Sequence, residues 1–174
     1  PLLTAGAAVR TAGGMQQPPM NFALVCPGVY RSGFPGRHNL SFLKSLGLRS
    51  LVSLAHGEYP SEVRDWIDEE GINTLGLSMP SNREPFVTMQ TETLLAALTA
   101  VLDPENHPVL VHCLRGQQQT GVLVGCIRKL QRWSLAATLD EYGRHAGLAA
   151  SLLDQQMIEL VDLHVLPKDA HGEL

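Results

Sequence analysis

The amino-acid sequence predicts an α/β fold in which helices flank a central, mostly parallel β-sheet. Short apolar segments alternate with longer segments whose apolar residues recur at helical spacing, and this alternation is typical of such folds. Residues 107–113 (HPVLVHC) are short and largely apolar, as expected for a strand in the middle of a parallel sheet. With 174 residues and 44% hydrophobic content, the chain is long enough for one domain with a sizeable core.

Capping and turn residues divide the first half of the chain into its expected elements. Asn39 is a helix-capping residue, and Gly47 and Gly71 follow helical patterns where glycine ends helices in the left-handed conformation. Apolar runs between these signals predict buried strands. The expected order is a strand or hairpin start at 24–31, a short helix at 40–46, a strand at 48–55, a helix after Ser61 and a strand at 72–79.

A loop rich in turn formers, residues 80–88, opens the second half of the chain. The elements expected after it are a helix at 91–102, a strand at 107–112, a strongly apolar helix at 120–132, and two helices that begin near Ser134 and Ser151 and end near residues 145 and 164. Ligands of parallel sheets bind beyond the carboxyl ends of the strands. The turn between residues 112 and 120 therefore occupies a favoured place for a site.

Composition changes at both ends of the chain suggest the domain boundaries. Residues 1–17 are rich in Ala and Gly but lack the basic start and continuous apolar stretch of a signal peptide, and Pro18-Pro19 follows them. We expect a flexible leader at 1–17, a single domain at 18–166 and a C-terminal tail at 167–174. A cytoplasmic location is the expectation that goes with this organisation.

Charge and cysteine content exclude several classes of protein. A net charge of -4 argues against a nucleic-acid-binding surface, and no apolar run is long enough to span a membrane. Three cysteines do not suggest a disulfide framework. Adjacent His112 and Cys113 would point to opposite faces of a strand, and no metal-ligand spacing occurs elsewhere. We therefore expect no metal and no cofactor.

The segment 109–121 (VLVHCLRGQQQTG) has the pattern of a strand, an anion-binding turn and a helix. Backbone N–H groups of such a turn, together with the positive end of the helix, would bind an anion and stabilise a Cys113 thiolate. Gly116 permits close approach of the backbone to the ligand, and Thr120 can cap the helix and offer its hydroxyl to the thiolate. These features predict that Cys113 attacks phosphorus and forms a phosphocysteine intermediate.

The residues around Cys113 have predicted supporting roles. His112 is expected to orient the turn through bonds to its carbonyl groups, and Gly121 to support it structurally. The phosphate-binding residues would be Leu114, Arg115, Gly116, Gln117, Gln118 and Gln119. The alternative is that Cys113 is simply a buried residue at a strand end, but the spacing of His, Gly and Thr-Gly around it favours the phosphate site.

The same segment resembles the signature of a known family. HCLRGQQQTG is similar to the His-Cys-x5-Arg-Thr/Ser-Gly motif of cysteine-dependent protein tyrosine and dual-specificity phosphatases. Further resemblance to the plant and fungal atypical dual-specificity phosphatases lies in residues 18–54, 82–86 (NREPF), 124–135 (VGCIRKLQRWSL), 140–142 (DEY) and 153–162 (LDQQMIELVD). The resemblance implies the cysteine-phosphatase fold and, for a subfamily regarded as inositol pyrophosphate phosphatases, a phosphate-rich small-molecule substrate.

The sequence departs from this family at several positions. The resemblance implies an arginine at position 119. Gln119 cannot form the bidentate, charged hydrogen bonds that a guanidinium makes to a phosphate. Relatives also tend to carry basic residues at positions 117, 118, 149 and 151, which are uncharged here. The loop 78–88 lacks the aspartate that would act as general acid, so Glu84 is the candidate acid and Arg83 a candidate phosphate contact.

These departures leave two functional hypotheses. The first, which the sequence favours, is a catalytically impaired protein or pseudophosphatase that binds phosphoanions and works with a protein partner. The alternative is an active phosphatase that uses Cys113 on inositol pyrophosphates or phosphoproteins, with Arg115 or Arg83 supplying the missing charge. A third reading is that Gln119 is an introduced substitution.

Overall fold

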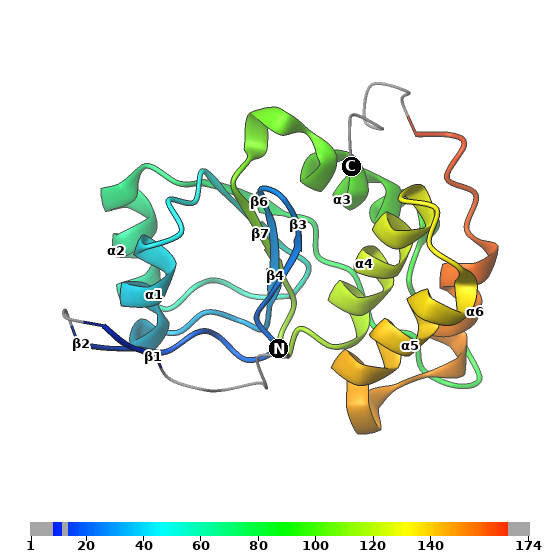
Figure 1. Ribbon diagram of the computed structural model, residues 1–174. Coiled ribbons are helices and arrows are strands. Elements are labelled where there is room, and N and C mark those ends of the chain that lie inside the picture. The colour runs from blue at the N-terminus through cyan, green and yellow to red at the C-terminus, as the bar shows by residue number, and fades with distance from the viewer. Residues whose placement is uncertain (1–8, 12–13, 167–174) are drawn as a thin grey trace.

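A central β-sheet lies between two layers of helices in the computed structural model, which describes residues 9–11 and 14–166 (Figure 1). The strand order is β3 (Ala23–Cys26), β4 (Val29–Ser32), β7 (Val109–His112), β5 (Ser50–Ser53) and β6 (Asn73–Gly76). Strands β4, β7, β5 and β6 run parallel, and β3 pairs antiparallel with β4. The predicted α/β fold with a mostly parallel sheet is confirmed.

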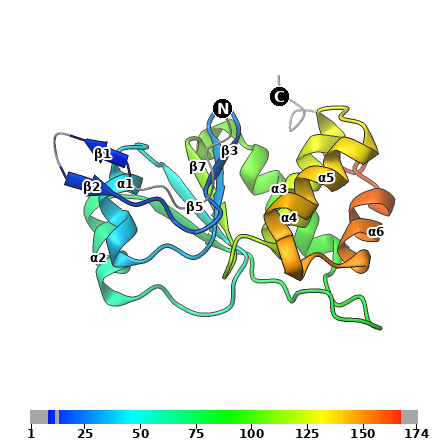
Figure 2. The ribbon, with the colours of Figure 1, turned by 60° about the horizontal axis from the view of Figure 1, so that its bottom comes forward.

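The helices cover both faces of this sheet (Figures 1 and 2). One layer contains α1 (Leu40–Lys44) and α2 (Ser61–Glu70), and the other contains α3 (Thr91–Leu102), α4 (Gln118–Leu130), α5 (Leu135–Ala146) and α6 (Leu152–Leu160). Short 3-10 turns occur at Arg37–Asn39, Pro104–Asn106 and Gly147–Ala149.

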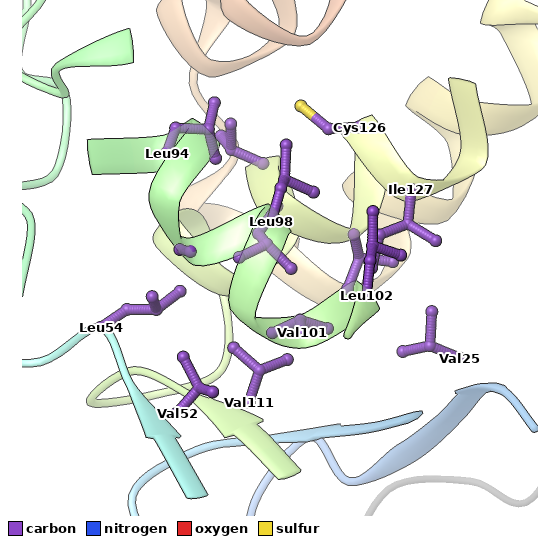
Figure 3. Close-up of a cluster of buried hydrophobic side chains, with 14 of the residues drawn as sticks. Val25, Val52, Leu54, Leu94, Leu98, Val101, Leu102, Val111, Cys126 and Ile127 are labelled. Atoms are coloured by element: carbon purple, nitrogen blue, oxygen red, sulfur yellow. The ribbon is translucent and has the colours of Figure 1, made fainter. Parts of the chain in front are cut away.

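Strand β7 lies in the middle of the sheet and is buried on both faces. Val109 and Val111 pack into the larger core under α3 and α4, whereas Leu110 points into the smaller core under α1 and α2. Figure 3 shows Val111 beside Val52 of β5, facing Val101 of α3. Apolar side chains on both faces explain why this strand reads as a continuous hydrophobic run.

Several predicted helix ends are confirmed by their capping geometry. Gly71 ends α2 in the left-handed conformation with φ 64°, and the Ser134 hydroxyl accepts a hydrogen bond from the Ala137 N–H at 3.2 Å at the start of α5. The last helix ends at Leu160 rather than near residue 164. There the Lys129 ammonium donates to the carbonyl oxygens of Ile158, Glu159 and Val161 at 2.7–3.0 Å, and the chain becomes extended.

The predicted leader contains a short antiparallel pair, β1 (Val9–Thr11) with β2 (Gly14–Gln16). The rest of that leader, residues 1–8 and 12–13, and the predicted tail 167–174 lie outside the described residues. The proposed domain boundaries therefore stay predictions. Among the helices of the described ranges, none is long and apolar enough to cross a membrane.

Candidate active site

Three parallel strands end in one row at the edge of the sheet where the predicted site lies. Ser32 of β4 and Ser53 of β5 are both in register with His112 at the end of β7. The loops that follow these strands are joined by backbone hydrogen bonds: the Phe34 N–H donates to the Leu114 carbonyl at 3.1 Å, and the Leu54 N–H to the His112 carbonyl at 2.8 Å. Two neighbouring loops thus support the turn that begins at Cys113.

Cys113 follows β7 directly and is almost fully buried, with 1% of its surface exposed. The turn after it approaches the end of β4 closely at Gly116, which has φ +67°. A Cβ atom at this position would lie 2.6 Å from the Gly33 nitrogen and from the Ser32 carbonyl carbon. Glycine is required here both for the backbone conformation and for the close approach.

The next residues of the turn lead into α4. The helix begins at Gln118, two residues earlier than predicted, and its N-cap is Gln117. The Gln117 side-chain amide donates to the carbonyl oxygen of Ala146 at 3.1 Å and so ties the turn to the end of α5. The expectation that Thr120 caps the helix is wrong because Thr120 already lies in its first turn. The Thr120 hydroxyl is buried and has no partner among the described residues, so the expected bond to the Cys113 sulfur is not formed.

Gln119 lies in the first turn of α4 and is half-buried. Its side-chain amide donates a hydrogen bond to the Met79 carbonyl oxygen at 3.3 Å, in the segment that follows β6. The Gln119 side chain therefore joins the start of α4 to the segment after β6. It lacks the charged guanidinium that the family signature implies at this position. Of the other predicted phosphate-binding residues, Leu114 and Arg115 are exposed and Gln118 is half-buried.

The loop between β6 and α3, which carries Arg83 and Glu84, passes beneath α4 toward α6 (Figure 2). Both side chains are exposed, and a short backbone bridge between Arg83 and Phe86 holds them in a tight turn. Within residues 14–166, no hydrogen bond or ion pair joins either side chain to the Cys113 turn. Their predicted roles as general acid and phosphate contact stay predictions.

Asn82 anchors this loop through a buried polar network. Its side-chain amide donates to an Asp154 carboxylate oxygen at 2.8 Å, and its carbonyl oxygen accepts the N–H groups of Thr88 and Met89 at 3.0 Å each. The Tyr142 hydroxyl donates to the other Asp154 oxygen at 2.7 Å. Burial raises the pKa of Asp154. The network fixes the loop to α5 and α6, since leaving any of these buried groups unpaired would be costly.

Gly121 allows α4 and α5 to pack closely beside the turn. A Cβ atom at Gly121 would lie 2.9 Å from the Tyr142 ring. The structural role predicted for this glycine is therefore one of helix packing, and it places the start of α4 against the same tyrosine that holds Asp154.

His112 is fully buried and contacts Tyr59 as well as the backbone of Cys113 at the start of the turn. Its Nε2 and the Tyr59 hydroxyl are hydrogen-bonded at 2.7 Å. The Phe34 ring packs against both side chains, with its centroid 5.1 Å from that of His112 and 5.3 Å from that of Tyr59. Burial lowers the pKa of His112 to about 4, so the imidazole is neutral at neutral pH. It holds the loops after β4 and β5 around the strand end without carrying charge.

This burial predicts that His112 contributes to acid sensitivity. The folded pKa of about 4 lies below the ordinary value of 6.5, so the unfolded chain binds a proton first as the pH falls. The stabilisation is present above pH 6.5 and is lost as the pH falls toward 4. We expect His112→Gln to reduce the loss of unfolding free energy between pH 7 and pH 4 by about 3 kcal/mol, measured by urea denaturation. The exposed His38→Gln is the control, and equal pH dependence in both variants would contradict the assignment.

Three contributions to the site were not predicted from the sequence. Tyr59 holds His112, and the Asn82–Asp154 pair holds the loop after β6. Arg31 of β4, which is 1% exposed, donates a hydrogen bond from Nη2 to the Gly116 carbonyl oxygen at 2.8 Å. The sequence feature that could have drawn attention to Arg31 was its charge, because it lies within a predicted strand. No grouping of three or more His, Cys, Asp or Glu side chains that could hold a metal ion occurs in the described part of the chain.

Comparison with known proteins identifies the family of this chain. The profile of the tyrosine phosphatase family matches residues 17–172. Inositol diphosphatase DSP4 of Arabidopsis thaliana is 44% identical over 154 residues, which cover 88% of this chain and 78% of that protein. Inositol diphosphatase SIW14 of Saccharomyces cerevisiae is 47% identical over 146 residues, or 83% of this chain and 52% of that protein. The chain thus spans about half the length of the yeast relative.

The fold is also found in solved structures. The core catalytic domain of the PP-IP phosphatase SIW14 from S. cerevisiae, in complex with citrate, superimposes with a TM-score of 0.79 at 46% identity, over 83% of this chain and 87% of that domain. TpbA of P. aeruginosa shares the fold at 23% identity with a TM-score of 0.63. The family match, the high identity over most of the chain and the shared fold show that this chain belongs to the tyrosine phosphatase family and, within it, to the subfamily of the inositol diphosphatases DSP and SIW14.

Proposed function

We propose that this chain is a Cys113-dependent phosphatase that cleaves the terminal phosphoanhydride bond of inositol pyrophosphates, at a rate that Gln119 limits. The observation that carries the proposal is the position of Cys113, directly after the central strand and at the start of a tight turn that leads into α4. Relatives with 44–47% identity are inositol diphosphatases, which supports the substrate class.

Several features of the turn would support phosphoryl transfer. The Cys113 thiolate attacks the terminal phosphorus, an S–P bond forms, and the bridging P–O bond breaks with its electron pair on the leaving phosphate. Water then cleaves the S–P bond and releases inorganic phosphate. The N–H groups of the turn and of the first turn of α4 would hold the phosphoryl oxygens, because the first N–H groups of a helix have no partner within it.

The leaving group explains why an exposed Glu84 is compatible with activity. When an ordinary ester is cleaved, the leaving alkoxide or phenoxide needs a proton from a general acid. A phosphoanhydride instead releases a phosphate group, whose second pKa is about 6, so this group leaves without strong acid assistance. The proposed substrate class therefore fits a loop in which no carboxylate is held against Cys113.

A second candidate function is phosphoanion binding without turnover. The hydrogen bond from the Gln119 amide to the Met79 carbonyl oxygen supports it, since position 119 then has a structural use that does not need charge. Such a protein would bind phosphate-rich ligands or a protein partner through the same turn. Retention of a buried cysteine at the start of the turn supports the catalytic proposal over this one.

Phosphate release from an inositol pyrophosphate tests the proposal, with this chain and Cys113→Ser as a matched pair. We expect this chain to release phosphate slowly. We expect Cys113→Ser to release it at least about 10³-fold more slowly still, because the nucleophile is removed. An equal rate in both proteins, or no release by this chain while Cys113→Ser still binds the substrate, would refute catalysis and support the binding candidate.

The same assay separates the substrate classes. A phosphotyrosine peptide and a simple aryl phosphate serve as comparison substrates. We expect a higher kcat/KM for the inositol pyrophosphate than for either, since their phenolic leaving groups need more acid assistance. A preference for the phosphopeptide would overturn the substrate assignment and keep the role of Cys113.

A further inference from the structure

Arg31 is a buried cation directly behind the phosphate-binding turn. It lies on β4, beside β7 in the sheet, and is paired in register with Val111. Because strand side chains alternate between faces, Arg31 points to the same side as Val29, which packs into the core beneath α3 and α4. From there its Nη2 donates to the Gly116 carbonyl oxygen at 2.8 Å.

No carboxylate neutralises Arg31 within the described ranges. The Glu141 carboxylate of α5 acts on Arg31 through its charge, but both of its oxygens are bound by Arg128 at 2.6 and 2.8 Å. The Nε and Nη1 atoms of Arg31 have no hydrogen-bond partner among the described residues. Burial lowers the pKa of Arg31 to about 10, which still leaves the guanidinium charged at neutral pH. Its charge is therefore available to the turn.

The bond to Gly116 also fixes the orientation of one peptide group. In a trans peptide the carbonyl oxygen of one residue and the N–H of the next point in opposite directions. When Arg31 holds the Gly116 carbonyl on the sheet side of the turn, the Gln117 N–H points to the other side. Gln117 is the N-cap of α4, so this N–H adds to the free N–H groups at the helix start.

We propose that Arg31 is a positioning residue of the phosphate-binding turn: it holds the Gly116 carbonyl behind the turn, directs the Gln117 N–H toward a bound phosphoanion, and supplies a fixed positive charge beneath that anion. Position 119 of this chain is a glutamine and carries no charge. The buried Arg31 guanidinium is therefore a positive charge that remains next to the turn. The phosphoanion is the ligand of the proposed function, whereas the contact between Arg31 and the turn is independent of it.

Several charged or titratable groups face Arg31 from the surrounding elements. They are Cys113 at the start of the turn, Glu141 and His145 of α5, and Arg128 of α4. Burial lowers the pKa of His145 to about 4, so it is neutral at neutral pH. The test is therefore made at one neutral pH, where His145 is neutral in every variant.

The test uses the full chain labelled with ¹⁵N, inorganic phosphate as the probe, and the variants Arg31→Met and Arg31→Lys. Calorimetry measures phosphate affinity, and NMR measures the chemical shift of the Gln117 amide. We expect Arg31→Met to lose about tenfold or more in affinity and to shift the Gln117 amide resonance, because the Gly116–Gln117 peptide group is no longer held. Arg31→Lys keeps the charge without the fork and should lose about threefold in affinity. Arg64→Met on α2 removes an equal but exposed charge and should bind phosphate normally.

The outcomes separate this proposal from the proposed function. A folded Arg31→Met that binds phosphate within about twofold of the parent chain, with an unchanged Gln117 amide, would overturn the role of Arg31. If Arg31→Met does not fold, Arg31→Lys decides by the same two readouts. A parent chain that does not bind phosphate would refute the proposed function, and a changed Gln117 amide shift in the Arg31 variants would then still support the positioning of the turn.

Discussion

Gln119→Arg is expected to raise the rate of phosphate release by about 10²–10³-fold. A guanidinium in the first turn of α4 would bind two phosphoryl oxygens and balance the negative charge that develops during transfer. The substituted glutamine loses only a 3.3 Å hydrogen bond to the Met79 carbonyl, so we expect the unfolding free energy to change by less than about 1 kcal/mol. Because the new contact strengthens in the transition state, the gain should appear mainly in kcat.

Gln118→Arg is the matched control for this prediction. It adds the same charge one residue earlier in the same helix turn, at another half-buried glutamine. A general increase in positive potential would raise the rate in both variants. Bidentate hydrogen bonds to the phosphoryl oxygens would raise the rate only when the arginine is at position 119. Steady-state kinetics on an inositol pyrophosphate distinguishes them. If Gln119→Arg is no faster than Gln118→Arg, the missing arginine does not limit this chain.

Gly116→Ala is expected to destabilise the protein by about 3 kcal/mol or more and to abolish tight phosphate binding. The added methyl group would meet backbone atoms of Ser32 and Gly33 at 2.6–2.7 Å, and backbone at a strand end cannot rotate away as a side chain can. The turn must therefore move, and the Gly116 carbonyl would leave the Arg31 guanidinium. Urea denaturation and phosphate calorimetry measure the two effects.

Gly47→Ala separates steric contact from backbone strain in this prediction. Gly47 also has a positive φ, +59°, but a Cβ atom there would meet nothing within 4 Å. We expect this control to cost about 1–2 kcal/mol, from the left-handed conformation alone, and to leave phosphate binding unchanged. Equal costs at both glycines would show that the close approach of the turn to β4 is not important for stability.

Local patterns in the sequence were sufficient to locate the proposed nucleophile, Cys113, at the end of a strand. The apolar run of β7 is buried on both faces, which identified a central parallel strand, and the position of Cys113 at its end followed from that. Gly71 and Ser134 were recognised as helix ends because their capping chemistry depends only on neighbouring residues. The start of α4 was predicted two residues late because the bend at Gly116, which sets it, depends on contact with another strand.

The supporting contacts of the site could not be predicted because they join residues that are far apart in the chain. Arg31 and Gly116 are 85 positions apart, and Asn82 and Asp154 are 72 positions apart. A charged residue in a strand or an aspartate in a helix can be exposed or buried, and only the packed fold decides between these. Single-residue patterns therefore identified the residues of the turn but not the side chains that hold it in place.

Capture of a phosphocysteine tests the central claim most directly. The chain is mixed with an inositol pyrophosphate, quenched within a single turnover, digested and analysed by mass spectrometry, with Cys113→Ser as the control. The proposed function predicts one phosphoryl group on the peptide that contains Cys113, formed before inorganic phosphate appears and absent from the control. Phosphate release without a phosphorylated Cys113, or at the same rate in Cys113→Ser, would contradict it.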